Sequence, residues 1–202
     1  MDFYIRAEGS PTKLAILPGA FNPPTRAHLA MAEAALTLVD EVLFVLPRVF
    51  PHKEYSAAGF DARLTLLRAA TAGNSRFSLA ASGRGLFIDL AREAHIDYGA
   101  DTELFLLCGR DAAERIVSWD YGEADSIGKQ VEVFRLLVAS RDGHYEPPPE
   151  IRERVISIGL SLDEISSSEV RRRIRSGEPW RDLVPDSIAR FIEARPDLWS
   201  GK

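Results

Sequence analysis

Residues 13–28 read KLAILPGAFNPPTRAH, and this stretch decides how the chain is built. Residues 13–18 are an apolar run that predicts a buried strand, which ends at Pro18-Gly19. Apolar residues then repeat at helical spacing and predict a helix over about residues 26–39. A buried strand joined by a short loop to a helix is the repeating unit of a sheet that helices cover.

The same alternation continues in both directions along the chain. Further strands are expected at 41–46, 76–81, 102–107, 131–139 and 155–160, and further helices at 61–70, 86–98, 168–176 and 186–194. Strands that are apolar throughout and alternate with helices predict an α/β fold, a doubly wound (Rossmann-like) parallel sheet with helices on both faces. Ligands of such sheets bind beyond the carboxyl ends of the strands, here residues 18–28, 47–55, 108–119, 140–145 and 161–171.

Composition narrows the class of protein. The chain of 202 residues is long enough for one domain, expected over 1–202, whose segment from about 160 to 202 is helical. A net charge of −5 argues against a nucleic-acid partner. No apolar run is long enough to span a membrane, and the lone Cys108 forms no internal disulfide. A cytoplasmic location is therefore expected.

The loop from Gly19 to His28 lacks both familiar phosphate-binding patterns, the dinucleotide motif and the P-loop. It nevertheless opens a helix, whose free N–H groups and positive dipole end favour an anion. His28, at the start of that helix, could donate to a phosphate oxygen. The alternative is structural: Thr25 as an ordinary helix cap and His28 as a packed side chain.

A second polar segment, residues 165–171 (ISSSEVR), also opens a helix. Ser166 and Glu169 have the spacing of a capping box, which would account for both of them. The remaining hydroxyls and Arg171 would together form a cradle for triphosphate oxygens.

Both segments resemble signatures of the nucleotidyltransferase superfamily that includes the nicotinate mononucleotide adenylyltransferases. The first is similar to Gly-x-Phe-[Asp/Asn]-Pro followed by [His/Thr]-x-Gly-His, and Ala27 departs from its usual glycine. The second is similar to Ile-Ser-Ser-Thr-x-[Ile/Val]-Arg, with Ser168 in place of threonine. The resemblance implies the HIGH-type nucleotidyltransferase architecture. The matching residues are Gly19, Phe21, Asn22, Pro23, Thr25, His28, Ile165, Ser166, Ser167 and Arg171.

Three more stretches resemble the pyridine-nucleotide branch of this superfamily. Pro51-His52-Lys53, followed by Arg63-Leu64, implies that Lys53 meets phosphate; otherwise it is a solvated lysine. The Gly109-x-Asp111 pair implies a carboxylate on ribose hydroxyls, and Trp119 a ring stacked on the pyridine. The structural alternatives are a helix-capping aspartate and a core tryptophan. Arg141, in a strand-end turn, implies a ligand contact.

One stretch departs from the branch. Residues 86–91 (LFIDLA) stand where the family has Tyr-Thr-x-Asp-Thr-Leu, so Phe87 and Leu90 replace two threonines. The lost hydroxyls would weaken recognition of a ring carboxylate. These replacements keep open a relative with another phosphorylated acceptor. A third alternative is a non-catalytic nucleotide-binding protein, which the loss of His28 or Arg171 would suggest, and both are present.

The resemblance implies adenylyl transfer from ATP to nicotinate mononucleotide, or its amide, which gives the dinucleotide and pyrophosphate in NAD biosynthesis. His28, Thr25, Lys53 and Arg171 are the implied catalytic residues. Gly19, Ala20, Phe21, Asn22, Ile165 and the serines at 166–168 are the implied triphosphate contacts. Mg²⁺ is expected to bind mainly through the triphosphate, without a cluster of protein ligands.

Overall fold

The computed structural model describes residues 1–48, 58–122, 126–140, 145–160 and 165–199. A seven-stranded sheet lies at its centre. Its strands are β1 (Asp2–Ile5), β2 (Lys13–Pro18), β3 (Glu41–Pro47), β4 (Phe77–Ser82), β5 (Glu103–Gly109), β6 (Arg135–Ser140) and β7 (Val155–Gly159).

The strand order is β1-β4-β3-β2-β5-β6-β7. Neighbours from β4 to β7 run parallel, in registers such as Ile16 opposite Leu43 on one side and Leu106 on the other. The chain winds outward in one direction from β2 to β4 and in the other from β5 to β7. This order defines a doubly wound sheet, whose switch point lies between β2 and β5.

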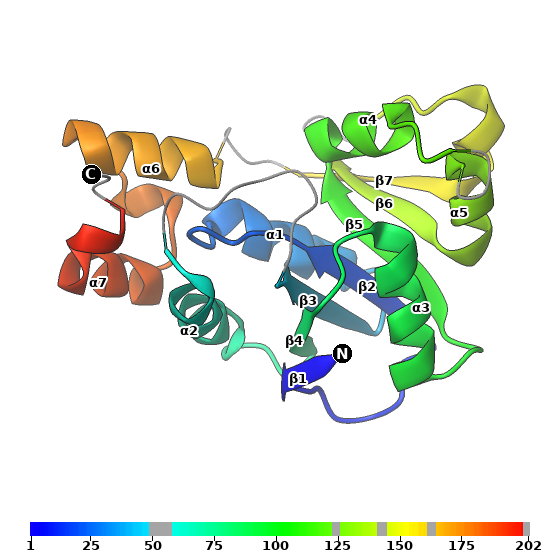
Figure 1. The fold of residues 1–202 in the computed structure, drawn as a ribbon, viewed down its shortest axis with the longest axis horizontal. Helices are drawn as coiled ribbons and strands as arrows, with labels where there is room; N and C mark the ends of the chain where they lie inside the picture. Colours follow the sequence, from blue (N-terminus) through cyan, green and yellow to red (C-terminus); the bar gives the residue numbers. More distant parts are fainter. Residues whose placement is uncertain (49–57, 123–125, 141–144, 161–164, 200–202) are drawn as a thin grey trace.

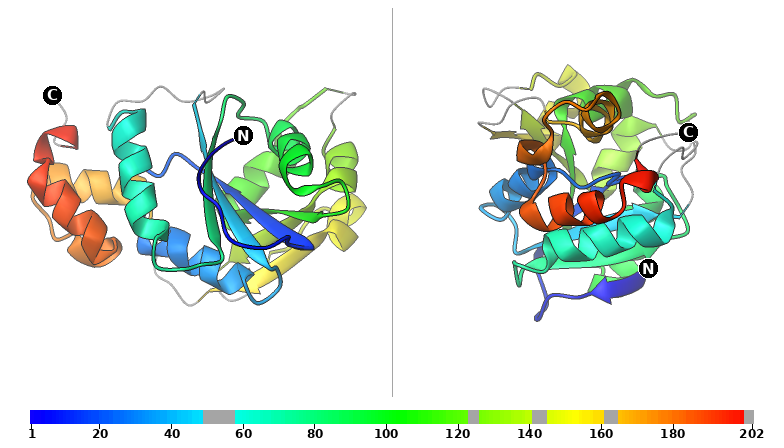
Figure 2. Two further views of the ribbon diagram at one scale, coloured as in Figure 1. Left: turned by 90° about the horizontal axis from the view of Figure 1, so that it is seen from below. Right: turned by 90° about the vertical axis from the view of Figure 1, so that its left-hand side faces the viewer.

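Helices cover both faces of the sheet (Figures 1 and 2). Helices α1 (Arg26–Ala35) and α2 (Phe60–Thr71) lie on one face, and α3 (Phe87–Tyr98), α4 (Arg110–Ser118) and α5 (Ile127–Val133) lie on the other. Helices α6 (Ser167–Ser176) and α7 (Asp186–Ala194) lie beyond α2, and α7 packs against it. Short 3-10 helices are η2 (Pro149–Arg154), η3 (Arg181–Leu183) and η4 (Pro196–Leu198).

The apolar strands are buried because both of their faces meet helices. In β2, Leu14 and Ile16 pack toward the α3–α5 layer, and Ala15 and Leu17 pack toward α1. A third cluster joins α2, α6 and α7 through residues such as Val170. The C-terminal helices are thus held to the sheet layers through α2.

Three local predictions need correction. The four-residue β1, which the sequence did not predict, pairs antiparallel with β4, so one edge strand is not parallel. Residues 127–133 form a helix where a strand was predicted from residue 131, because Ile127 and Val131 pack at helical spacing. Helix α1 ends at Ala35 rather than near Val39, in a turn where Thr37 Oγ1 donates to the Ala34 carbonyl at 2.7 Å.

Within the described residues, no helix has the length and apolar character needed to cross a membrane. The expectation that residues 1–202 form a single domain stays a prediction.

Candidate active site

The candidate site begins with the two loops that follow β2 and β5 at the switch point. Gly19 directly follows β2, and its N–H donates to the Val45 carbonyl of β3 at 3.1 Å. Gly109 ends the neighbouring strand β5 and is the N-cap of α4. Helices α1 and α4 leave toward opposite faces, so the chain diverges where this class of sheet binds ligands.

The first loop owes its shape to Gly19 and Phe21. Phe21 has a left-handed φ of 46°, which is uncommon for a bulky residue. Its ring folds back toward Gly19, where a Cβ would lie 2.9 Å from the ring. The ring is buried between Phe44 and His28, with centroids 5.8 and 5.1 Å away. Phe21 therefore shapes the loop from the core side, and only its backbone remains to face a ligand.

The structure brings the two signature segments into direct contact. Ser167 Oγ donates to the Pro23 carbonyl at 2.8 Å, across 144 residues of sequence. Arg171 Nη1 donates to the Asn22 carbonyl at 2.6 Å, and Arg171 Nη2 donates to Ser168 Oγ at 3.1 Å. The N-termini of α1 and α6 therefore lie at one site, which concentrates free N–H groups and positive dipole ends there.

A second arginine supports the loop from beneath. Arg63, on α2, is 2% exposed, and its Nη1 donates to the Ala20 carbonyl at 3.2 Å. The sequence pointed to Arg63 only as part of the match that follows Lys53. Burial also lowers the pKa of the Arg171 guanidinium from its ordinary value, although Arg171 stays positively charged at neutral pH. Two cations thus bind carbonyls of the loop.

His28 is held in one tautomer. Its Nδ1 accepts the backbone N–H of Thr25 at 3.0 Å and lies 2.7 Å from the Thr25 hydroxyl. A backbone N–H can only donate, so Nδ1 is the acceptor and the ring proton sits on Nε2. Burial lowers the pKa of His28 to about 4, which makes the ring neutral at pH 7. His28 therefore presents a neutral N–H donor.

Thr25 is fully buried and is the N-cap of α1. The structural alternative for Thr25 and His28 is thus partly right, because the pair forms a capping box in which His28 takes the place usual for glutamate or glutamine. The capping contact also orients the imidazole.

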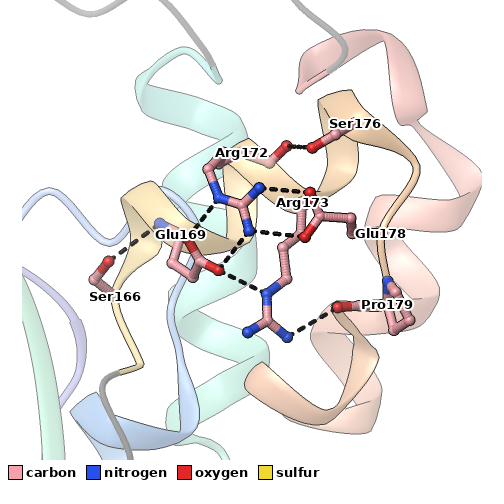
Figure 3. Close-up of polar contacts among 7 residues, drawn as sticks. All are labelled: Ser166, Glu169, Arg172, Arg173, Ser176, Glu178 and Pro179. Atoms are coloured by element: carbon pink, nitrogen blue, oxygen red, sulfur yellow. Dashed lines mark hydrogen bonds and ion pairs between the residues drawn. The ribbon is translucent and has the colours of Figure 1, made fainter.

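The residues of the second segment have different structural roles. Ile165 packs against the third cluster, and Ser166 Oγ caps α6 by accepting the Glu169 N–H at 3.1 Å. Figure 3 shows that Arg172 and Arg173 converge on the Glu169 carboxylate, which lowers the pKa of Glu169 to about 2. The capping account therefore holds for Ser166, whereas Arg171 points to the first loop.

The α4 side of the site matches neither structural alternative. Asp111 is exposed in the first turn of α4, where Gly109 rather than Asp111 is the N-cap. Trp119 follows α4 and is 49% exposed, so it is not a core residue. A Cβ at Gly109 would meet only Met31 Sδ, at 4.0 Å, so packing does not require this glycine.

The altered stretch at the start of α3 splits into two cases. Leu90 is 0% exposed and belongs to the core, so replacing a threonine there does not remove a hydroxyl from an open site. Phe87 is half-buried and packs against the same core. Lys53 and Arg141 lie outside the described residues.

No group of three or more His, Cys, Asp or Glu side chains within the described residues is arranged to hold a metal ion. The arrangement consists instead of helix N-termini, a neutral imidazole donor and a guanidinium around one loop. Such donors bind and stabilise phosphate charge.

Comparison with known proteins agrees with this class of site. A family model described as "Cytidylyltransferase-like" matches residues 16–173. The chain belongs to this family, and it is a nucleotidyltransferase.

The relatives narrow the family further. A probable nicotinate-nucleotide adenylyltransferase of Geobacter sp. (strain M21) is 31% identical over 90% of this chain and 95% of its own length. One from Tropheryma whipplei (strain Twist) is 32% identical over 86% of this chain and 93% of its own. Within the cytidylyltransferase-like proteins, the chain therefore belongs to the nicotinate-nucleotide adenylyltransferases.

Solved structures confirm the fold. The nicotinic acid mononucleotide adenylyltransferase of Plasmodium falciparum, complexed with APC, superposes with a TM-score of 0.69 at 21% identity. The alignment covers 94% of this chain and 98% of that one. The predicted doubly wound α/β fold is thus confirmed.

Proposed function

We propose that this chain transfers the adenylyl group of ATP to the 5′-phosphate of nicotinate mononucleotide, releasing pyrophosphate and forming the dinucleotide. The observation that carries the proposal is the direct contact between the two signature segments, in which Arg171 and Ser167 bond the carbonyls of Asn22 and Pro23. Two loops that resemble phosphate-binding signatures thereby form one site.

The attacking group needs no general base, because a phosphate monoester is already ionised at neutral pH. The protein has to align two anions and stabilise the charge that develops on the phosphate oxygens. In this mechanism His28 donates its Nε2–H to an oxygen of the α- or β-phosphate. Thr25 acts as a positioning residue, because its fully buried side chain contacts His28 rather than solvent.

The β- and γ-phosphates would lie at the start of α6. Ser168 and the N-terminal amides of α6 face them in this proposal, together with the guanidinium N–H groups of Arg171 that are not bonded to Asn22 and Ser168. Ser167, whose hydroxyl is bonded to Pro23, supports the loop. Mg²⁺ would arrive on the triphosphate, held by phosphate and water oxygens, and would neutralise part of its charge.

The acceptor would lie on the α4 side. In this proposal the exposed Trp119 ring stacks on the pyridine, and the exposed Asp111 carboxylate binds ribose hydroxyls. The burial of Leu90 favours the pyridine acceptor, since that substitution leaves the open surface unchanged. Phe87 is then the one substitution of the stretch that weakens carboxylate recognition. Lys53 and Arg141 keep their predicted phosphate and ligand contacts as proposals.

The test is to incubate the protein with ATP and Mg²⁺ and, separately, nicotinate mononucleotide, its amide and a panel of other phosphorylated acceptors. Chromatography should show a dinucleotide with nicotinate mononucleotide. Pyrophosphate release with another acceptor, but with neither pyridine mononucleotide, would refute the pyridine assignment. Release with none of them would argue for nucleotide binding without transfer.

A further inference from the structure

Trp199, the last residue that the structure describes, lies outside both signature segments. Its side chain is 1% exposed and belongs to the cluster of α2, α6 and α7. The ring meets Phe191 edge-on, with centroids 6.2 Å apart. Its indole Nε1–H donates to Oδ1 of Asn22 at 3.2 Å, across 177 residues of sequence.

Asn22 is the residue of the first loop that Trp199 contacts. The residue is 5% exposed, so water does not readily replace the indole as the partner of its side-chain oxygen. The carbonyl of the same residue accepts the bond from Arg171. The next carbonyl, on Pro23, accepts the bond from Ser167. Three contacts from the C-terminal part of the chain thus converge on two consecutive loop residues.

The first loop depends on hydrogen bonds from other parts of the chain because its own backbone can form few. Phe21 is in the left-handed region, and the prolines at 23 and 24 have no N–H to donate. The backbone therefore has little capacity to fix its own shape through hydrogen bonds. Contacts from elsewhere in the fold hold such a conformation in place.

We propose that Trp199 is a positioning residue for the triphosphate loop. It fixes the Asn22 side chain and thereby the carbonyl to which Arg171 bonds. That Trp199 contributes to ATP binding rests on the proposed function, in which this loop and Arg171 hold the triphosphate. Trp199 itself touches no substrate.

Trp199→Phe removes the N–H and keeps an aromatic ring in the cluster. The matched control is Phe191→Leu, which alters packing against the same ring but leaves the indole donor in place. Both variants should lower the melting temperature of the full-length protein. A role limited to packing would make them alike in every other measurement.

Two measurements separate the variants. The first is hydrogen–deuterium exchange without nucleotide, measured on peptides covering residues 17–27. Exchange should be at least about fivefold faster in Trp199→Phe, since that variant loses one stabilising contact to the loop. It should be unchanged in Phe191→Leu, which keeps the contact. Calorimetry should show ATP binding about tenfold weaker in Trp199→Phe and within about twofold of wild type in Phe191→Leu. The KM for the acceptor should stay within about twofold in both, because Trp119 is unaffected.

If either the exchange or the ATP affinity of Trp199→Phe matches that of Phe191→Leu, the positioning role is refuted. The exchange measurement requires no substrate, so it is independent of the reaction. A wild-type protein that binds ATP but uses no pyridine mononucleotide would refute the proposed acceptor. In that case the two measurements above would still decide the role of Trp199.

Discussion

Replacing His28 with alanine removes both roles of the imidazole, the phosphate donor and the helix cap. The variant loses the Nε2–H, which the mechanism assigns to a phosphate oxygen, and turnover should fall by about 10²–10³-fold, the scale for one transition-state donor. It also loses Nδ1, which accepts the backbone N–H of Thr25 at 3.0 Å. Because Thr25 is 0% exposed, that N–H would be left buried without its acceptor, which costs about 1–3 kcal/mol of stability.

His28→Gln is the control, because glutamine at this position of a capping box can accept the same N–H. It should recover most of the stability that alanine loses, while turnover stays low. Pyrophosphate release and thermal unfolding of the three proteins provide the comparison. Near wild-type turnover in His28→Ala would remove His28 from the mechanism. Recovery of both properties in His28→Gln would reduce the imidazole to a helix cap.

The remaining predictions concern the cradle, the acceptor and pH. Arg171→Ala should weaken ATP binding by about 1.5–3 kcal/mol, whereas Arg172→Ala, whose guanidinium pairs with Glu169 and Glu178, should not; equal losses in calorimetry would indicate a diffuse basic surface. Trp119→Ala should raise the acceptor KM and spare ATP affinity, and a matching loss of ATP affinity would contradict stacking on the acceptor. The pKa of His28 lies at about 4 rather than 6.5, so the unfolded chain binds the extra proton first and stability should be lost as pH falls between these values, by at most about 3 kcal/mol. His28→Gln should lack this component; an identical decline of melting temperature in both proteins would refute it.

The central strands β2 to β6 were predictable from sequence because their residues are mostly buried between two layers of helices. Their apolar runs can be recognised without knowing which strands pair. Strand β2, for example, begins and ends where the pattern predicts. The edge strand β1 was missed, since its four residues, one exposed and three half-buried, carry too short a pattern. Residues 131–133 were misassigned because the β-branched Val131 and Val133 favour a strand, whereas Val131 and Ile127, four residues apart, pack into the same core cluster from one helix.

The candidate site was predictable as two separate loops but not as one assembly. Helix-start position and residue type indicated His28 and Arg171, yet no spacing in the sequence shows that Arg171 bonds the Asn22 carbonyl 149 residues away. The contacts of Arg63, which the resemblance had named without a role, and of Trp199 were out of reach for the same reason. Each acts on the loop through a contact that only the folded chain creates.

The structural and the functional interpretations of the first loop do not exclude each other. The capping contact between Thr25 and His28 commits Nδ1 as an acceptor, and this fixes the ring proton on Nε2. Burial holds the imidazole neutral, so it lends a donor to the site without adding a charge that would have to be buried when no ligand is bound. The positive charge comes instead from Arg171, whose guanidinium stays protonated regardless of burial. A helix cap is therefore the means by which this fold prepares a phosphate donor, and the same two residues serve stability and chemistry together.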